Sequence, residues 1–436
     1  GRTLARLTVP MVAGIAGMVA FNLTDAFFVG RLGARELAAI GFTFPVVALI
    51  TRVAMGIGVG ASAVISRAVG RGDRRMVRRL TTDSLTLAIC IVALFVAGGF
   101  AALGPLFGAL GAEGEILGLV REYMEIWLAG VIFVVFPMVS NNAIRANGDM
   151  KTPAMIMIVA VVVNIVLDPL LIFGIGPFPR LELAGAALAT VIARAVQLVV
   201  SFWVVCVRRR MVTFERRPLV EVLDSWRSIL YIGIPAAATR LIEPLGIAVV
   251  TGIIASGGPK GVAAYGVAVR IEFLAMAVVF ALASVLGPFV GQNWGAGRRD
   301  RIMRAISLSN RFTLLWGLGV FAALSLPARA IAGLFSGDPE VVGGVAIYLR
   351  TAAAAYCLYG GLVISTFIMN VLHRPLHASG LAIGQMFLLT VPMAWAGWRL
   401  GGLAGSFAGV GLSYALAGVA ARLVLRGVLG RLEERG

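Results

Sequence analysis

Twelve apolar runs, each long enough to cross a lipid bilayer, follow one another along this 436-residue chain. A spanning helix needs about 20 mainly apolar residues, and on that rule six helices are predicted at 8–30, 38–63, 82–104, 118–142, 153–175 and 183–207. Six more are predicted at 228–254, 262–288, 306–327, 343–370, 377–398 and 402–425. A mean hydropathy of +0.94 also lies far above the range of a soluble globular protein. The predicted fold is therefore an all-α polytopic membrane protein.

The second six runs repeat the first six. A shift of 225 residues aligns Pro10 with Pro235, Gly41 with Gly266, Gly72 with Gly297, Glu115 with Glu340, and Tyr123 with Tyr348. Matches at one register indicate two copies of a six-helix unit, and an even number of helices relates the copies by a pseudo-two-fold axis along the membrane normal. We predict an N-lobe over 1–207, a cytoplasmic linker over 208–227 and a C-lobe over 228–436, with the substrate site between the lobes.

The basic residues are distributed unevenly among the loops of the chain. The chain has 38 Lys and Arg against 21 Asp and Glu, a net charge of +17, and most basic residues fall in alternate loops. This bias predicts that both termini are cytoplasmic. Because the charge sets orientation in a lipid bilayer, we expect no nucleic-acid partner.

Two of the predicted helices of the N-lobe carry a buried acid, Asp25 and Asp168. A carboxylate near the middle of a bilayer costs about 2.5–3.5 kcal/mol and is usually retained because it binds or carries an ion. Helix rise places Asp25 about 25 Å and Asp168 about 22 Å above the cytoplasmic ends of their helices, a level that Thr190 also reaches. Asn164 shares a face with Asp168 at a spacing of four residues.

These four side chains predict a cation site. Two carboxylates close together in a low dielectric cannot both stay ionised cheaply, so the pair is expected to bind a proton, or Na⁺ through carboxylate, amide and hydroxyl oxygens. The alternatives are structural: the acids tie neighbouring helices together, Asn164 and Thr190 make ordinary interhelical hydrogen bonds, and Tyr123 is an interfacial anchor.

Several segments resemble the multidrug and toxic compound extrusion (MATE) family, in its prokaryotic branch similar to the DNA-damage-inducible members. The similar segments are 22–33 (NLTDAFFVGRLG), 145–153 (RANGDMKTP), 164–169 (NIVLDP), 185–190 (GAALAT) and 290–297 (VGQNWGAG). The resemblance implies a secondary active antiporter of a prokaryotic inner membrane. It would export organic, often cationic, amphipathic compounds in exchange for H⁺ or Na⁺ by alternating access of two lobes.

The same resemblance implies residue roles. It places cation binding at Asp25, Asn164, Asp168 and Thr190, matches Tyr123 and Asn141 to the N-lobe cavity, and matches Pro10 to a proline at which the first helix bends. No cofactor is expected beyond the coupling ion, and we expect a monomer.

The C-lobe lacks a copy of this site, because Asp25 falls on Val250 under the shift of 225. Glu243 lies at a membrane depth where some branches of the family bind a cation. Those branches carry an aspartate four residues after a tenth-helix tyrosine, but after Tyr356 this chain has Gly360. Glu243 and Tyr356 are therefore candidates for coupling or for the substrate cavity, with an intramembrane ion-pair cluster formed with Arg240, Arg270 and Glu272 as the alternative.

Other functions fit the residues less well. A flippase for lipid-linked sugars shares this architecture and is the main alternative. An intramembrane aspartyl protease would use Asp25 and Asp168 but usually has a Gly-x-Gly-Asp motif, which is absent before Asp168, so we expect no enzyme. Cys90, Cys206 and Cys357 predict neither a disulfide framework nor a metal cluster. The run from Gly56 to Gly60 is interpreted as a close helix approach.

Overall fold

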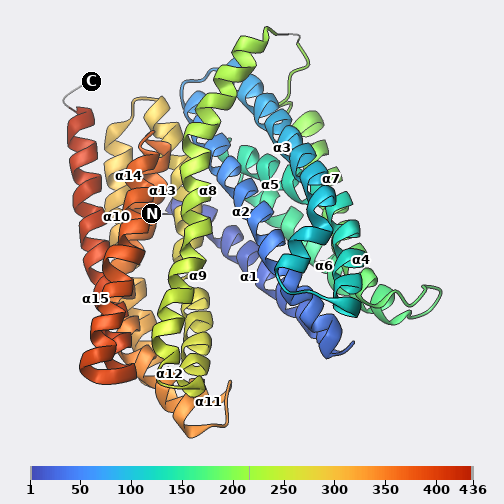
Figure 1. Cartoon of the computed structure of the whole chain (residues 1–436). Helices are drawn as coiled ribbons and strands as arrows, with labels where there is room; N and C mark the ends of the chain where they lie inside the picture. Colours follow the sequence, from blue (N-terminus) through green and yellow to red (C-terminus); the bar gives the residue numbers. More distant parts are fainter. Residues whose placement is uncertain (1, 216, 434–436) are drawn as a thin grey trace. The chain divides into compact units, whose positions relative to one another are not determined.

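The computed structural model describes residues 2–215 and 217–433, and every secondary-structure element in these ranges is a helix (Figure 1). The chain divides into two compact units. The N-terminal unit is Arg6–Ala237, and the C-terminal unit is Gly1–Ala5 with Ala238–Gly436. The expected all-α fold is confirmed.

The first unit contains seven α-helices and a short π-helix before the long helix that enters the second unit. Its helices are α1 (Arg2–Gly30), α2 (Ala34–Gly70), α3 (Arg74–Ala109), α4 (Gly114–Ala129), α5 (Val131–Ala146), α6 (Lys151–Phe173), α7 (Glu182–Trp203) and the π-helix η1 (Val204–Arg208). Helix α8 (Leu219–Ala255) begins in the N-terminal unit and ends in the C-terminal unit.

The second unit continues with α-helices of 6 to 43 residues, a 3-10 helix and a π-helix. They are α9 (Pro259–Gly295), α10 (Arg299–Ser325), α11 (Ala328–Gly333), α12 (Pro339–Thr351), the 3-10 helix η2 (Ala352–Ala355), α13 (Tyr356–Val371), α14 (Pro375–Gly384), the π-helix η3 (Gln385–Thr390) and α15 (Val391–Glu433).

The twelve predicted spans are all found among these helices. Nine helical stretches of the described residues are long and apolar enough to cross a membrane, and the pair α4–α5, bent by 46°, makes a tenth. Helix α10 has 27 residues and covers the predicted run 306–327, although it is not among the stretches apolar enough to qualify. The stretch Pro375–Arg431 has 57 residues, too long for one span, and the non-helical backbone at Gly401 and Gly402 divides it into two.

Helix breaks occur at equivalent places in the two units. Gly130 separates α4 from α5, and η2 separates α12 from α13, and Gly130 aligns with Ala355 at the end of η2 under the shift of 225. A Cβ atom at Gly130 would lie 2.5 Å from Val191 Cγ2, so only glycine lets α7 approach here. What the sequence predicted as one helix over 118–142 is therefore two helices with a bend.

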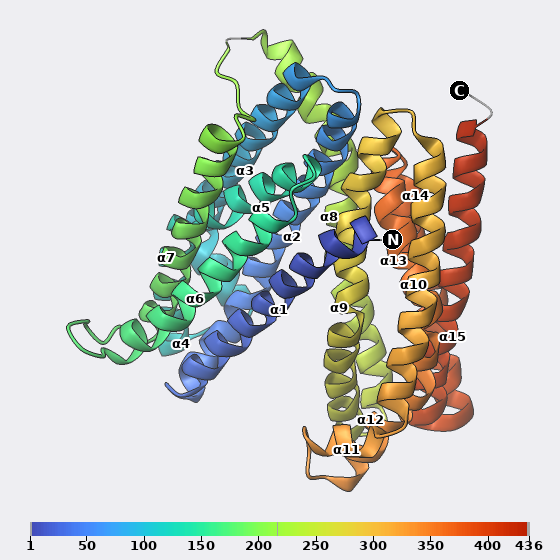
Figure 2. The same ribbon diagram turned by 180° about the vertical axis from the view of Figure 1, so that it is seen from behind.

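In the N-terminal unit, α5 lies against α2, α3 and α7, and α6 lies against α7. Helix α1 runs along α6 (Figure 2). At Gly14 an added Cβ atom would be 3.6 Å from Ala154 Cα, and near the other end the rings of Phe28 and Phe173 are 6.2 Å apart. Both helices that carry the predicted acids are thus neighbours.

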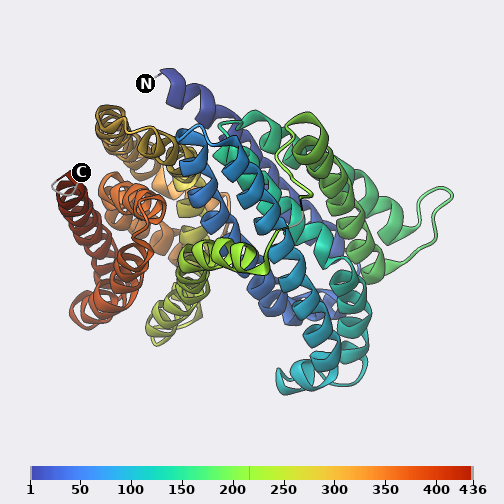
Figure 3. The ribbon, with the colours of Figure 1, turned by 90° about the horizontal axis from the view of Figure 1, so that it is seen from above.

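In the C-terminal unit, α13 takes the central place that α5 has in the other unit. It packs against α9, α10, α14 and α15 (Figure 3). Val131 at the start of α5 aligns with Tyr356 at the start of α13 under the shift of 225. The repeat read from the sequence is therefore also a repeat of packing within each unit.

Glycines of α2 allow the beginning of α8 to come very close. A Cβ atom at Gly60 would lie 2.2 Å from the Ile229 carbonyl oxygen, and one at Gly56 would lie 2.6 Å from the Gly233 carbonyl oxygen. Small residues allow such backbone contact between spanning helices. The interpretation of the run from Gly56 to Gly60 as a close helix approach is confirmed.

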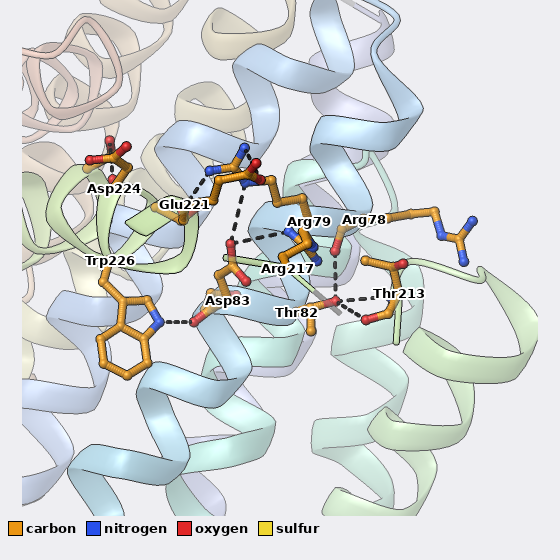
Figure 4. A network of polar contacts seen from close by, with 12 residues as sticks. Arg78, Arg79, Thr82, Asp83, Thr213, Arg217, Glu221, Asp224 and Trp226 are labelled. Atoms are coloured by element: carbon orange, nitrogen blue, oxygen red, sulfur yellow. Dashed lines mark hydrogen bonds and ion pairs between the residues drawn. The ribbon is translucent and has the colours of Figure 1, made fainter. Parts of the chain in front are cut away.

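The segment between η1 and α8 is fixed to α3 by polar contacts (Figure 4). Arg78 Nε donates to the Val212 carbonyl at 3.1 Å, and the Thr213 N–H donates to Thr82 Oγ1 at 3.0 Å. Asp149 holds the beginning of the same segment through an ion pair with Arg209. Burial raises the pKa of Asp149, but hydrogen bonds from Thr152 and the contact with Arg209 outweigh burial, and its pKa is lowered.

Asp83 is the centre of the network in Figure 4. Its side chain is buried, and its Oδ2 lies 3.7 Å from both Arg79 Nε and Arg217 Nη1. Trp226 Nε1 donates to the Asp83 carbonyl at 2.9 Å, and Arg79 Nη1 lies 3.2 Å from Glu221 Oε2. These contacts explain why the first part of α8 belongs to the N-terminal unit. The lobe boundaries at 207 and 228 stay a prediction.

Candidate cation-binding site

The pair Asn164 and Asp168 is the best-defined part of the predicted site. Both side chains are on α6 and have no exposed surface, and Asn164 Nδ2 donates to Asp168 Oδ1 at 3.0 Å. Their spacing of four residues places them one above the other on one face of the helix. The contact expected from the sequence is therefore present.

Thr190 lies on α7, which is in close contact with α6, the helix of Asn164 and Asp168. A Cβ atom at Gly185 would lie 2.4 Å from the Leu171 carbonyl oxygen, so α7 rests directly on the backbone of α6 three residues after Asp168. Thr190 follows Gly185 by five residues and is 8% exposed. Its hydroxyl is thus buried on the helix next to the acid.

Asp25 approaches the same group from α1. It is half-buried and lies within electrostatic range of Asp168 and Tyr123. Tyr123, on α4, is buried at 7% exposure and interacts electrostatically with both acids. Side chains from α1, α4 and α6 therefore converge, and the two carboxylates lie within range of each other's field.

Three oxygens of the predicted residues are buried without a hydrogen-bond partner among the described residues. They are Asp168 Oδ2, Asn164 Oδ1 and Asn141 Oδ1. A buried acceptor that lacks a donor costs about 1–3 kcal/mol, more when it is charged. A proton on Asp168 would remove the cost at its carboxylate, and a hard cation bound by the oxygens of Asp168 and Asn164 would remove it at both residues.

Arg194 is a residue near the acids that the sequence analysis did not place at the site. It follows Thr190 by one helical turn on α7, and its guanidinium carbon lies 4.8 Å from the centre of the Phe21 ring, one turn before Asp25 on α1. Arg194 Nη1 donates to Gln197 Oε1 at 3.0 Å, and its charge interacts with Asp25. An arginine inside an apolar span was the signal available in the sequence.

Pro10 lies inside α1, which is one continuous helix from Arg2 to Gly30. Its imide nitrogen cannot donate the usual helical hydrogen bond, so the helix has a weak point there. The role of Pro10 in bending stays a prediction.

Of the two candidate residues in the C-terminal unit, one lies at the surface and the other in the interior. Glu243 on α8 is exposed, whereas Tyr356 is fully buried and its hydroxyl donates to Glu272 Oε2 at 3.2 Å. In the described part of the chain the hydrogen bonds of Glu272 come from tyrosines, so the ion-pair alternative does not describe this residue. A Cβ atom at Gly360 would lie 2.8 Å from Thr313 Cβ, which explains why no acid stands at that position.

Two bundles of apolar helices with a buried acidic site define a polytopic membrane transporter. The MatE family model matches residues 10–170 and 235–396, most of the chain, and its two matches begin 225 residues apart. The chain belongs to this family, whose members are transporters rather than enzymes, and the resemblance to MATE proteins is confirmed.

Known proteins resemble the chain over nearly its full length. The FAD transporter of Shewanella oneidensis is 37% identical over 405 residues, 93% of this chain and 90% of that protein. The probable multidrug resistance protein NorM of Thermotoga maritima is 25% identical, covering 78% of this chain and 73% of that protein. The crystal structure of the Vibrio cholerae MATE transporter VcmN in the bent form matches with a TM-score of 0.94 at 28% identity, over 99% of this chain and 97% of that chain.

Proposed function

We propose that this protein is a cation-coupled antiporter that exports small organic compounds in exchange for H⁺ or Na⁺. The observation that carries the proposal is the group Asp25, Asn164 and Asp168, with buried oxygens that lack donors. Such a group has free energy to gain from a proton or a small cation. If the cation and the substrate favour different arrangements of the lobes, binding of one drives release of the other.

The proposed orientation in the membrane is supported by the distribution of the basic residues. The excess of Arg in alternate loops supports cytoplasmic termini, and we place the chain in a prokaryotic inner membrane as a monomer. Gly72 and Gly297, in equivalent basic loops, both adopt the left-handed backbone of a helix-ending turn, with φ of 74° and 68°. These loops are therefore helix caps that carry the basic residues of the proposed cytoplasmic face.

Two substrate classes follow from the family. The relatives named as multidrug resistance or export proteins favour small organic drugs, which we propose to be cationic and amphipathic. The 37% identical relative named as an FAD transporter favours a flavin nucleotide, which is anionic. Arg194 at the edge of the acidic site supports the second class, because a guanidinium group binds phosphate oxygens well.

The proposal is tested by export from everted vesicles, driven separately by a pH gradient and by a Na⁺ gradient. The substrates are ethidium, norfloxacin and FAD, and the variants are Asp25→Asn and Asp168→Asn. We expect one gradient to drive export in the wild type and both variants to lose it. Glu115→Gln, which removes an exposed acid of the same unit, serves as the control. Full export in both site variants would contradict the proposal, and movement of a lipid-linked sugar alone would favour the flippase.

A further inference from the structure

Glu272 on α9 is surrounded by three tyrosine hydroxyls from three other helices. Tyr348 of α12 and Tyr356 of α13 donate to Oε2, the latter at 3.2 Å, and Tyr414 of α15 donates to Oε1 at 2.9 Å. Glu272 itself is only partly buried. The carboxylate therefore lies among donors from three helices, while part of the residue remains exposed.

The tyrosines are held in place by aromatic packing. Tyr348 and Tyr356 have no exposed surface, and Tyr414 has 9%. The Tyr348 ring meets Phe407 edge to face at 5.0 Å between centres, and Tyr414 stacks on Tyr359 at 4.4 Å. Burial and ring contacts therefore position the Tyr348 and Tyr414 hydroxyls at the carboxylate, and burial positions that of Tyr356.

One of these tyrosines stands at a position equivalent to a tyrosine of the N-terminal unit. Tyr348 aligns under the shift of 225 with Tyr123, which lies within electrostatic range of Asp25 and Asp168. Tyr356 and Tyr414 align with Val131 and Ala189, which carry no hydroxyl. The carboxylate also differs, because Glu272 aligns with Val47 on α2. The C-terminal unit thus keeps one tyrosine of the repeat and takes its acid and its other hydroxyls from other positions.

The donor arrangement favours a proton over a metal ion. The three hydroxyls donate to the carboxylate and fill three of its about four lone-pair sites. A metal ion that needs several of these sites would have to displace them. A proton needs only the remaining site, on Oε1, which accepts from Tyr414 alone among the described residues, and no heavy atom has to move.

We propose that Glu272 is a proton-binding site of the C-terminal unit, separate from the Asp25 and Asp168 site, so that each unit takes up and releases a proton during export. This rests on the antiport function proposed above. The titratable groups that face Glu272 are Glu243 from α8, Tyr265 from its own helix, Tyr348 from α12, Tyr356 and Tyr359 from α13, and Tyr414 from α15.

The test measures charge displaced by pH jumps, with no substrate present, in full-length protein reconstituted in liposomes on a solid-supported membrane. Glu272→Gln is expected to remove about half of the displaced charge, and Asp25→Asn with Asp168→Asn the other half. Glu340→Gln, an acid of the same unit outside the site, is the matched control and should leave the signal unchanged. A wild-type signal in Glu272→Gln would overturn the proposal.

Tyr356→Phe keeps the proposal falsifiable if Glu272→Gln does not fold. Loss of one donor destabilises the carboxylate anion, so the pH midpoint of the Glu272 component should rise by about one unit with no loss of amplitude. An unchanged pH midpoint in Tyr356→Phe would overturn the assignment. So would a charge displacement after a jump in Na⁺ concentration that is present in the wild type and absent in Glu272→Gln. Failure of the antiport function would look different: pH jumps would displace charge in the wild type, but no gradient would drive export.

Discussion

Both units carry an ion pair at the same pair of equivalent positions. Arg35 Nη1 lies 2.7 Å from Glu115 Oε2 in the N-terminal unit, and Lys260 Nζ lies 2.8 Å from Glu340 Oε1 in the C-terminal unit. Each pair is related to the other by 225 residues, and each joins the beginnings of two spanning helices. The repeat has kept these contacts although one base changed from Arg to Lys.

The two units share their outer ion pairs, but they differ in the acids of their interiors. The N-terminal unit places Asp25 on α1 and Asp168 on α6, whereas the C-terminal unit has Val250 and Met393 at the equivalent positions and places Glu272 on α9. The two units therefore share their helix packing and their surface contacts. They differ in which helix supplies a buried acid. Under the two proposals made above, the two units would bind their cations by different chemistry.

The largest expected effect is that of Asp168→Asn on energy-driven transport. The asparagine keeps the size of the side chain and a contact with Asn164 but cannot take up and release a proton. We expect gradient-driven export to fall at least about 100-fold, measured as initial rates in proteoliposomes. Glu272→Gln should leave a partial rate in the same assay. Equal rates for the two variants would mean that the units do not differ as described.

Asp83→Asn should cause the next largest effect, on stability. Asp83 is a buried acid found in the N-terminal unit only, since Leu308 stands at the equivalent position. Its loss leaves Arg79 and Arg217 without their shared anion, and partial exposure of Arg79 reduces the penalty to on the order of 2 kcal/mol. Thermal unfolding in detergent measures this, with Asp224→Asn as the control. A stability equal to that of the wild type would show that the network does not anchor the segment.

Arg194→Gln should move the pH dependence of export without abolishing it. Removal of a positive charge near Asp25 favours the neutral form of the acid pair, so half-maximal proton-driven export should occur at a higher pH, by roughly one unit. The glutamine can still bond to Gln197. A profile that superimposes on that of the wild type would exclude Arg194 from the site.

The smallest effect is expected at the outer ion pair of the N-terminal unit. The side chains of Arg35 and Glu115 are 68% and 70% exposed, and exposed ion pairs contribute little to stability. Arg35→Ala should change the melting temperature by less than about 2 °C. A larger fall in the melting temperature would mean that this outer ion pair contributes substantially to stability.

Helical content, the repeat and one contact of the site could be predicted from the sequence. Apolar runs specify spanning helices because the bilayer demands that length, and the four-residue spacing of Asn164 and Asp168 fixes their contact. The register of 225 residues returns in the family match and in the equivalent ion pairs.

Contacts between helices distant in sequence could not be predicted. The three tyrosines around Glu272 come from α12, α13 and α15, and no spacing within one helix brings them together. The bend at Gly130 and the fixed segment before α8 likewise depend on contacts with other helices, which the apolar pattern does not predict. Arg194 was visible as a charge inside a span, but its proximity to Asp25 required the packing of α1 near α7.

The most direct measurement compares two modes of transport in Asp168→Asn proteoliposomes. Exchange of labelled substrate for unlabelled substrate needs only alternating access, whereas uphill export needs the coupling ion. We predict that Asp168→Asn keeps exchange near the wild-type rate and loses uphill export under both a pH and a Na⁺ gradient. Uphill export at the wild-type level in this variant would contradict the account.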